Sequence, residues 1–176
     1  MSRYSYVLQS ITNKKKSLIG IFPFNALIDF ENSSLSGGKL EFYESAIEGL
    51  KLLAQKQTKV ILFVNQFKQH PLSYDQFNAL NQAVEGFIRQ HGVQVEGFYW
   101  CPVSDKKDPF VVPNSGMFSR ATENQQINWE GIPVISSFDN DLVAASKVKA
   151  DPIKIGKGSE KWTLFEDFYE YAKTIN

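Results

Sequence analysis

Short apolar runs alternate with amphipathic segments along most of this chain, and that alternation restricts the fold more than any other feature. Apolar runs typical of buried strands occur at 18–22, 59–64, 93–100, 132–136 and 152–155. Between them, segments 41–53, 74–90, 116–123 and 139–147 have the spacing of helices that bury one face. Strands that alternate with helices predict a central parallel sheet with helices on both faces.

Several boundaries follow from local chemistry. Ser73, with Gln76 three residues later, forms a capping-box pattern and predicts a helix start at 74. Pro133 predicts that its strand begins late or lies near a sheet edge. We expect 152–155 to be the last strand, and we expect the aromatic-rich segment 161–173 to be one amphipathic helix.

Composition excludes several classes of protein. The chain has 176 residues, with 19 basic and 19 acidic side chains, and this balance argues against nucleic-acid binding through bulk charge. The N-terminus has no apolar stretch long enough for a signal peptide or a membrane helix, so we expect neither there. One cysteine and two histidines exclude a disulfide framework and leave too few ligands for zinc. We expect a cytoplasmic protein with an N-terminal extension (1–16), either packed or mobile, and one domain (17–176).

The first strand ends at a position where ligands usually bind in open α/β sheets, just outside the carboxyl ends of the strands. Phe22 and Phe24 occupy this position. A phenylalanine side chain cannot ionise, bind a metal or act as a nucleophile, so the sequence predicts an unusual site here.

The spacing of several segments resembles one known family. The stretches that carry the resemblance are 43–53, 60–66, 95–102, 115–121, 141–145 and 156–158. Together they resemble the haloacid dehalogenase (HAD) superfamily, and within it the histidinol-phosphate and D,D-heptose-1,7-bisphosphate phosphatases. The resemblance covers residues 18–158 and implies a three-layer, Rossmann-like HAD fold without a large cap domain.

The chemistry implied by the resemblance is absent from the matching positions. Phe22 and Phe24 stand where the family has its nucleophilic and acid–base aspartates. Val64 replaces the phosphate-binding hydroxyl, Val112 the lysine, and Ser137 a metal-binding aspartate. Asp141, the second acid of that last motif, remains. The zinc loop of the subfamily starts at Cys101-Pro102, but its histidine and later cysteines are missing.

These replacements predict a catalytically inactive pseudophosphatase that acts as a binding or interaction module, with no cofactor. The resemblance links it to sugar-phosphate or cell-envelope carbohydrate metabolism. One alternative is an active sugar-phosphate phosphatase with Mg²⁺ that uses carboxylates among Asp29, Asp139 and Asp141. Another is a non-catalytic sugar or nucleotide sensor that binds through Asn65, Ser137 and Asp141. We expect a protein partner, no nucleic acid, no membrane, and a monomer or weak dimer.

Structural roles are the simpler interpretation of the same polar residues. Asp141 fits the first turn of a helix, where the helix dipole favours an acid. Asn65 and Gln66 fit backbone hydrogen bonding at a strand end, and Ser136-Ser137 fits a helix cap. Cys101 fits a packed, unreactive side chain.

Overall fold

The computed structural model describes residues 17–158 and 161–176, so the proposed extension at 1–16 lies outside the described residues. Its centre is one six-stranded sheet in which all paired strands run parallel. The strands are β1 (Leu18–Ile21), β2 (Lys59–Asn65), β3 (Gln94–Cys101), β4 (Pro133–Ser136), β5 (Asp151–Ile155) and β6 (Thr163–Phe165). The predicted parallel α/β architecture is confirmed.

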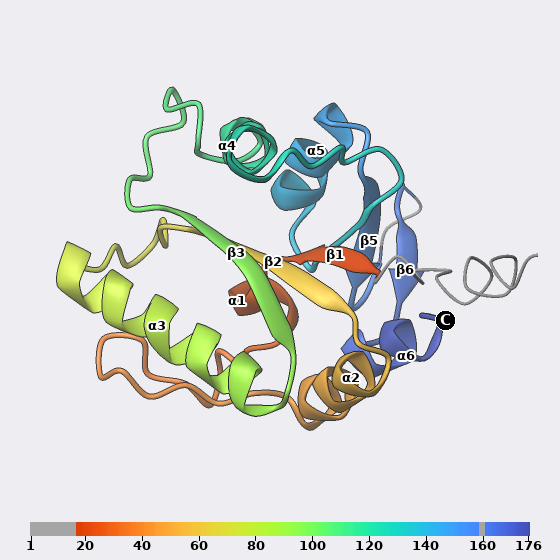
Figure 1. The fold of residues 1–176 in the computed structure, drawn as a ribbon. Coiled ribbons are helices and arrows are strands. Elements are labelled where there is room, and N and C mark those ends of the chain that lie inside the picture. Colours follow the sequence, from red (N-terminus) through yellow and green to blue (C-terminus); the bar gives the residue numbers. More distant parts are fainter. Residues whose placement is uncertain (1–16, 159–160) are drawn as a thin grey trace, which may run out of the picture.

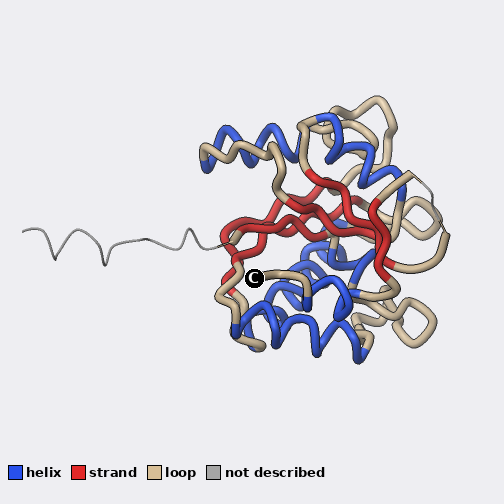
Figure 2. The backbone as a smooth tube through the Cα atoms, turned by 90° about the vertical axis from the view of Figure 1, so that its right-hand side faces the viewer, coloured by secondary structure: helices blue, strands red, loops and turns tan. Residues whose placement is uncertain are grey.

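Helices cover both faces of this sheet. They are α1 (Pro23–Ala26), α2 (Glu44–Gln55), α3 (Tyr74–Gln90), α4 (Gly116–Gln125), α5 (Asp139–Lys147) and α6 (Phe168–Lys173). Figure 1 shows α4 and α5 on one face, and α2, α3 and α6 on the other. The three layers are also visible in the rotated view of Figure 2. No cap domain is inserted within the described ranges, and none of the helices there is long and apolar enough to cross a membrane.

Strand β2 shows how the sequence builds a core on each face. Successive side chains of a strand point to opposite faces of its sheet. Val60, Leu62 and Val64 accordingly join the core beneath α2 and α3, whereas Ile61 and Phe63 join the core beneath α4 and α5. All five are buried, which explains why β2 reads as a continuous apolar run and not as an alternating one.

The strand order β3-β2-β1-β4-β5-β6 places a switch point in the middle of the sheet. From β1 the chain first builds outward through β2 and β3, and then returns to place β4 on the other side of β1. Crevices in open α/β sheets form outside the carboxyl ends of the strands at such a switch point. The loops after β1, β2 and β4 are therefore the expected location of a site.

Two predicted boundaries are settled by the structure. The Ser73–Gln76 capping box is present at the start of α3, which ends at Gln90. Strand β4 lies between β1 and β5, so the prediction of an edge position is wrong and the late start is correct. Pro133 is tolerated there because it is the first residue of the strand, where fewer ladder hydrogen bonds are required.

The prediction for the C-terminal segment is wrong in its first half. Residues Thr163–Phe165 form β6, which pairs with β5, so β5 is not the last strand. The helix begins only at Phe168, where the Asp167 side chain accepts a hydrogen bond from the Glu170 N–H. Pairing with β6 satisfies backbone groups that β5 would otherwise leave exposed at the sheet edge. This long-range pairing outweighs the helical spacing of the aromatic residues.

Candidate functional site

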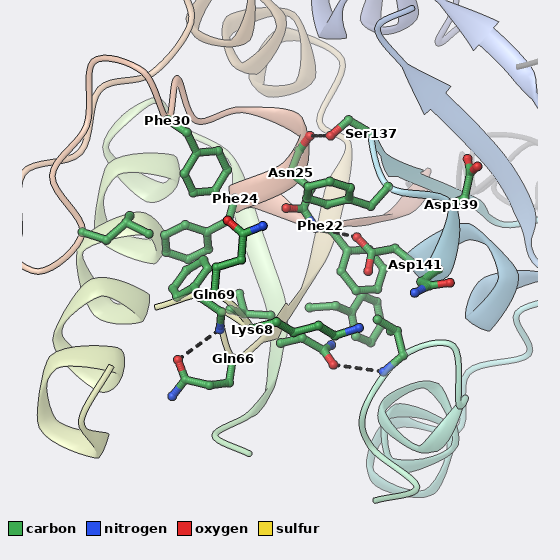
Figure 3. A pocket seen from close by; sticks show the side chains of 18 of the residues that line it. Phe22, Phe24, Asn25, Phe30, Gln66, Lys68, Gln69, Ser137, Asp139 and Asp141 are labelled. Carbon is green, nitrogen blue, oxygen red and sulfur yellow. Dashed lines mark hydrogen bonds between the residues drawn. The ribbon is translucent and has the colours of Figure 1, made fainter. Parts of the chain in front are cut away.

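A cavity of about 720 Å³ lies at the carboxyl ends of β1, β2 and β4 and is open to solvent. Figure 3 shows its lining side chains. All the positions that the resemblance marks as altered lie in this lining: Phe22, Phe24, Val64, Val112 and Ser137. Asn65 and Asp141 lie there too. Residues far apart in the sequence are thus brought together at the switch point of the sheet.

Phe22 and Phe24 belong to the two cores and do not project as free groups. Phe22 is 1% exposed and packs on the rings of Phe63 and Phe118, at centroid distances of 5.4 and 6.2 Å. Phe24 is 3% exposed and makes an edge contact with Phe67 at 5.2 Å, on the other face of the sheet. Each ring supplies apolar packing at a position where the resemblance implies a carboxylate.

Two valines make the neighbouring part of the pocket apolar as well. Val64 ends the buried run of β2, and Val112 lies in the loop before α4; both are nearly inaccessible. The Val112 N–H donates a 3.0 Å hydrogen bond to Asn65 Oδ1. The Asn65 oxygen is therefore occupied by the backbone, as expected for a residue at a strand end.

Asp141 is the one acidic side chain buried in this pocket among the described residues, and it is 2% exposed. Its Oδ2 accepts hydrogen bonds from Asn25 Nδ2 and Ser136 Oγ, each at 2.6 Å. Burial raises the pKa of Asp141 to about 6, against the opposing effects of these two hydrogen bonds and of the Lys68 charge. The carboxyl thus changes charge in the mildly acidic range.

The serines hold the loop after β4 against the loop after β1. Ser136 Oγ accepts a hydrogen bond from the Phe138 N–H just before α5, while donating to Asp141. The Ser137 hydroxyl donates to the carbonyl of Asn25. The capping interpretation is wrong, because the N-cap residue of α5 is Phe138 and no side chain makes a capping hydrogen bond there. The contacts show instead that Ser137, which replaces a metal-binding acid in the resemblance, is engaged within the protein.

The Gln66 side chain likewise makes hydrogen bonds to backbone groups. Its amide nitrogen donates to the carbonyls of Leu72 and Pro102, and its oxygen accepts from the N–H groups of Phe67 and Leu72. Gln66 thereby fixes the loop that follows β2. The interpretation of strand-end hydrogen bonding is confirmed for this residue.

The residues of the pocket do not fit a Mg²⁺ ion, which the fold family would imply. Magnesium prefers several oxygen ligands in octahedral geometry. Within the described residues, no group of three acidic, histidine or cysteine side chains could hold a metal. Asp139 Oδ1 accepts hydrogen bonds from Lys154 Nζ at 2.8 Å and from Trp162 Nε1 at 3.1 Å. These contacts hold Asp139 away from Asp141, so the two carboxylates do not form a metal-binding pair.

The other acid and the cysteine considered from the sequence have structural partners. Asp29 accepts hydrogen bonds from the Glu31 N–H and from Asn32. Cys101 is buried, its Sγ lies 3.6 Å from the Val103 carbonyl oxygen, and burial raises its pKa. A thiol held neutral in this way is packed and unreactive, as interpreted from the sequence.

Sequence reasoning missed several side chains that shape the pocket: Asn25, Phe30, Phe67, Lys68 and Phe138. Asn25 directly follows the altered motif, so its place near Asp141 could have been inferred from the resemblance. The others lie on loops, and nothing in their spacing signals a site.

Comparison with known proteins places the fold. No model of a known protein family matches the chain, and no curated protein matches its sequence. Among solved structures, D,D-heptose 1,7-bisphosphate phosphatase from B. bronchiseptica, complexed with magnesium and phosphate, aligns with a TM-score of 0.75 and 18% identity. The alignment covers 89% of this chain and 96% of that one.

Two further structures give the same result. The D,D-heptose 1,7-bisphosphate phosphatase of Burkholderia thailandensis aligns at a TM-score of 0.66 and 15% identity, over 90% of this chain and 97% of that one. A putative HAD-like phosphatase from Mesorhizobium loti aligns at 0.68 and 14% identity, over 90% and 83%. At these identities the likeness shows a shared fold. This chain therefore has the HAD fold, as the resemblance implied.

Proposed function

We propose that this protein is a catalytically inactive, phosphatase-like binding module. The observation that carries the proposal is the filling of the pocket: buried Phe22, Phe24, Val64 and Val112 occupy the positions that the resemblance assigns to catalytic and phosphate-binding groups. Ser137 is hydrogen-bonded within the protein.

These replacements remove the means of phosphoryl transfer together. The reaction depends on positioning and on neutralising the charge of the transferred group. Removal of a nucleophile alone costs about a millionfold in another covalent enzyme. A phosphate dianion would also lose its hydration against four apolar side chains, which is unfavourable without compensating donors.

A cavity remains although the catalytic groups are absent, and this favours a binding role. At about 720 Å³ it lies within the range of small-molecule sites, roughly 300–1,000 Å³. The names of the structural neighbours suggest a place beside sugar-phosphate or cell-envelope carbohydrate enzymes. That setting, a protein partner, the cytoplasm, and a monomeric or weakly dimeric state are parts of the proposal, because a shared fold does not fix function.

The active-phosphatase alternative needs a pair of carboxylates facing the pocket. Asp139 is paired with Lys154, and its side chain is 61% exposed. Asp141 is buried and bonded to Asn25 and Ser136. This arrangement disfavours the two acting as a nucleophile and an acid. The sensor alternative retains support from the accessible cavity.

A melting experiment tests the proposal. We expect Mg²⁺ with orthovanadate, a phosphate mimic, to leave the melting temperature of the protein unchanged. An active site that bound this pair at about 100 times its dissociation constant would gain about 2.7 kcal/mol, or roughly 5–10 °C. An Asp141→Asn variant is the matched control. A shift of several degrees that requires both Mg²⁺ and Asp141 would contradict the proposal.

A further inference from the structure

The carboxyl of Asp141 has an unused acceptor that faces the pocket. Its Oδ2 takes both hydrogen bonds, from Asn25 and Ser136, and Oδ1 accepts none from the residues that the structure describes. The side chain is almost fully buried, and Figure 3 shows its carboxyl pointing into the cavity. Oδ1 is not among the fully buried atoms that lack a partner, so it is accessible from the pocket and can accept a charge-assisted hydrogen bond from a ligand.

Lys68 supplies the opposite charge at the same cavity. Its ammonium makes no hydrogen bond or ion pair with any described residue, although it lines the pocket and extends across it toward Asp141. It is near enough to lower the pKa of Asp141, yet no salt bridge joins the two side chains. The Lys68 ammonium and Asp141 Oδ1 therefore lie apart in the same cavity, and each can still bind a ligand of opposite charge.

The other charges of the pocket cancel each other. Lys154 Nζ lies 2.8 Å from Asp139 Oδ1, so this pair contributes no free charge. The unpaired groups are then one cation and one anion. Such a lining complements a ligand that carries both charges, and it disfavours a dianion, which would meet Asp141 without a second cation.

Aromatic rings form an apolar wall beside these two groups. Phe67 contacts Phe24 at 5.2 Å and Phe30 at 6.2 Å, both edge to face. Phe30 and Phe138 line the same cavity and remain 40% and 55% exposed. Exposed rings in a pocket gain from contact with a flat apolar group.

We propose that this pocket binds a free α-amino acid with an aromatic side chain. The ammonium of the ligand would donate to Asp141 Oδ1, its carboxylate would accept from Lys68, and its ring would pack on Phe30 and Phe67. The inference rests on the proposed function only in that the pocket binds without chemistry.

Calorimetric titration of the full chain with L-phenylalanine tests this inference. We expect binding, and we expect weaker binding of two partial ligands: 2-phenylethylamine, which lacks the carboxylate, and 3-phenylpropanoate, which lacks the ammonium. Lys68→Gln and Asp141→Asn should each weaken L-phenylalanine binding by about 10- to 100-fold, the usual effect of losing a charge-assisted hydrogen bond. Lys106→Gln, an exposed lysine outside the pocket, should bind as the wild type does.

The two variants also show which contact, that of Lys68 or that of Asp141, is responsible for a loss of binding affinity. Lys68→Gln should weaken binding of 3-phenylpropanoate and leave 2-phenylethylamine unaffected, whereas Asp141→Asn should do the reverse. No binding of L-phenylalanine at millimolar concentration, or affinity unchanged in both variants, would overturn the inference. Neither result affects the proposed lack of catalysis, which is tested separately by turnover of a phosphate ester and by the melting experiment with Mg²⁺ and orthovanadate.

Discussion

Asp141→Asn is expected to raise the free energy of unfolding at pH 8 by about 3 kcal/mol. Burial lifts the pKa of this carboxyl from 3.8 to about 6 in the folded protein. The folded state therefore favours the protonated form, and its stabilising effect is complete below about pH 4. That effect is lost as the pH rises through about 6, because a buried charge then forms. Asparagine stays neutral and keeps an oxygen that can accept from Asn25 and Ser136.

Urea denaturation of both proteins between pH 4 and pH 8 measures this difference. The advantage of Asp141→Asn should grow between about pH 4 and pH 6 and then level off. Asp139→Asn serves as the control with the opposite sign, because hydrogen bonding to Lys154 lowers the pKa of Asp139. Its variant should be less stable than the wild type from about pH 5 upward by an amount that no longer changes with pH, and the difference should shrink only as the pH falls to about 4 and below. Equal stability of Asp141→Asn and the wild type at pH 8 would show that Asp141 is not held in a costly charged state.

Asn81→Leu is expected to stabilise the protein by about 1–3 kcal/mol. Asn81 lies on the buried face of α3 and is 1% exposed. Both polar atoms of its side chain are buried without a hydrogen-bond partner. Folding therefore removes the hydrogen bonds that these two atoms make with water, and the folded protein supplies no hydrogen bonds to replace them. Leucine has a similar volume and no polar atoms, so the penalty disappears.

Thermal and chemical denaturation can check this, with Gln82→Leu as the matched control. Gln82 is the next residue of the same helix and is exposed, so its replacement should change stability by less than about 0.5 kcal/mol. A loss of stability in Asn81→Leu, with Gln82→Leu unchanged, would indicate that Asn81 has a partner in solution, such as a buried water molecule.

Local signals predicted the position of several helices. The capping box at Ser73 marked the start of α3, and α5 spans the predicted 139–147 although no side chain caps its start. The C-terminal segment failed because its aromatic spacing is compatible with a helix, whereas its real partner, β5, is fixed only by the tertiary fold. The interior position of β4 likewise depends on strand order, which no local pattern encodes.

The altered positions of the site could be predicted because most of them lie at or just after strand ends, and strand ends of a parallel sheet meet at one edge. Phe22, Val64 and Ser137 come together for that reason. The contribution of Lys68 could not be predicted, because its side chain reaches the pocket from an exposed loop. The sequence also could not show that Asp141 Oδ2 is hydrogen-bonded while Oδ1 is left to face the pocket. That difference depends on contacts with Asn25 and Ser136 that form only in the folded chain.

The central claim, that this HAD fold has lost its chemistry, is tested most directly by a phosphatase assay. Purified protein would be assayed with Mg²⁺ on an aryl phosphate and on a panel of sugar phosphates, beside an Asp141→Asn preparation that reveals contaminating enzymes. We expect no turnover above that preparation, because none of the altered positions carries the carboxylate, hydroxyl or lysine that the resemblance assigns to it. Turnover in the wild type that disappears in Asp141→Asn would contradict the account and assign catalysis to Asp141.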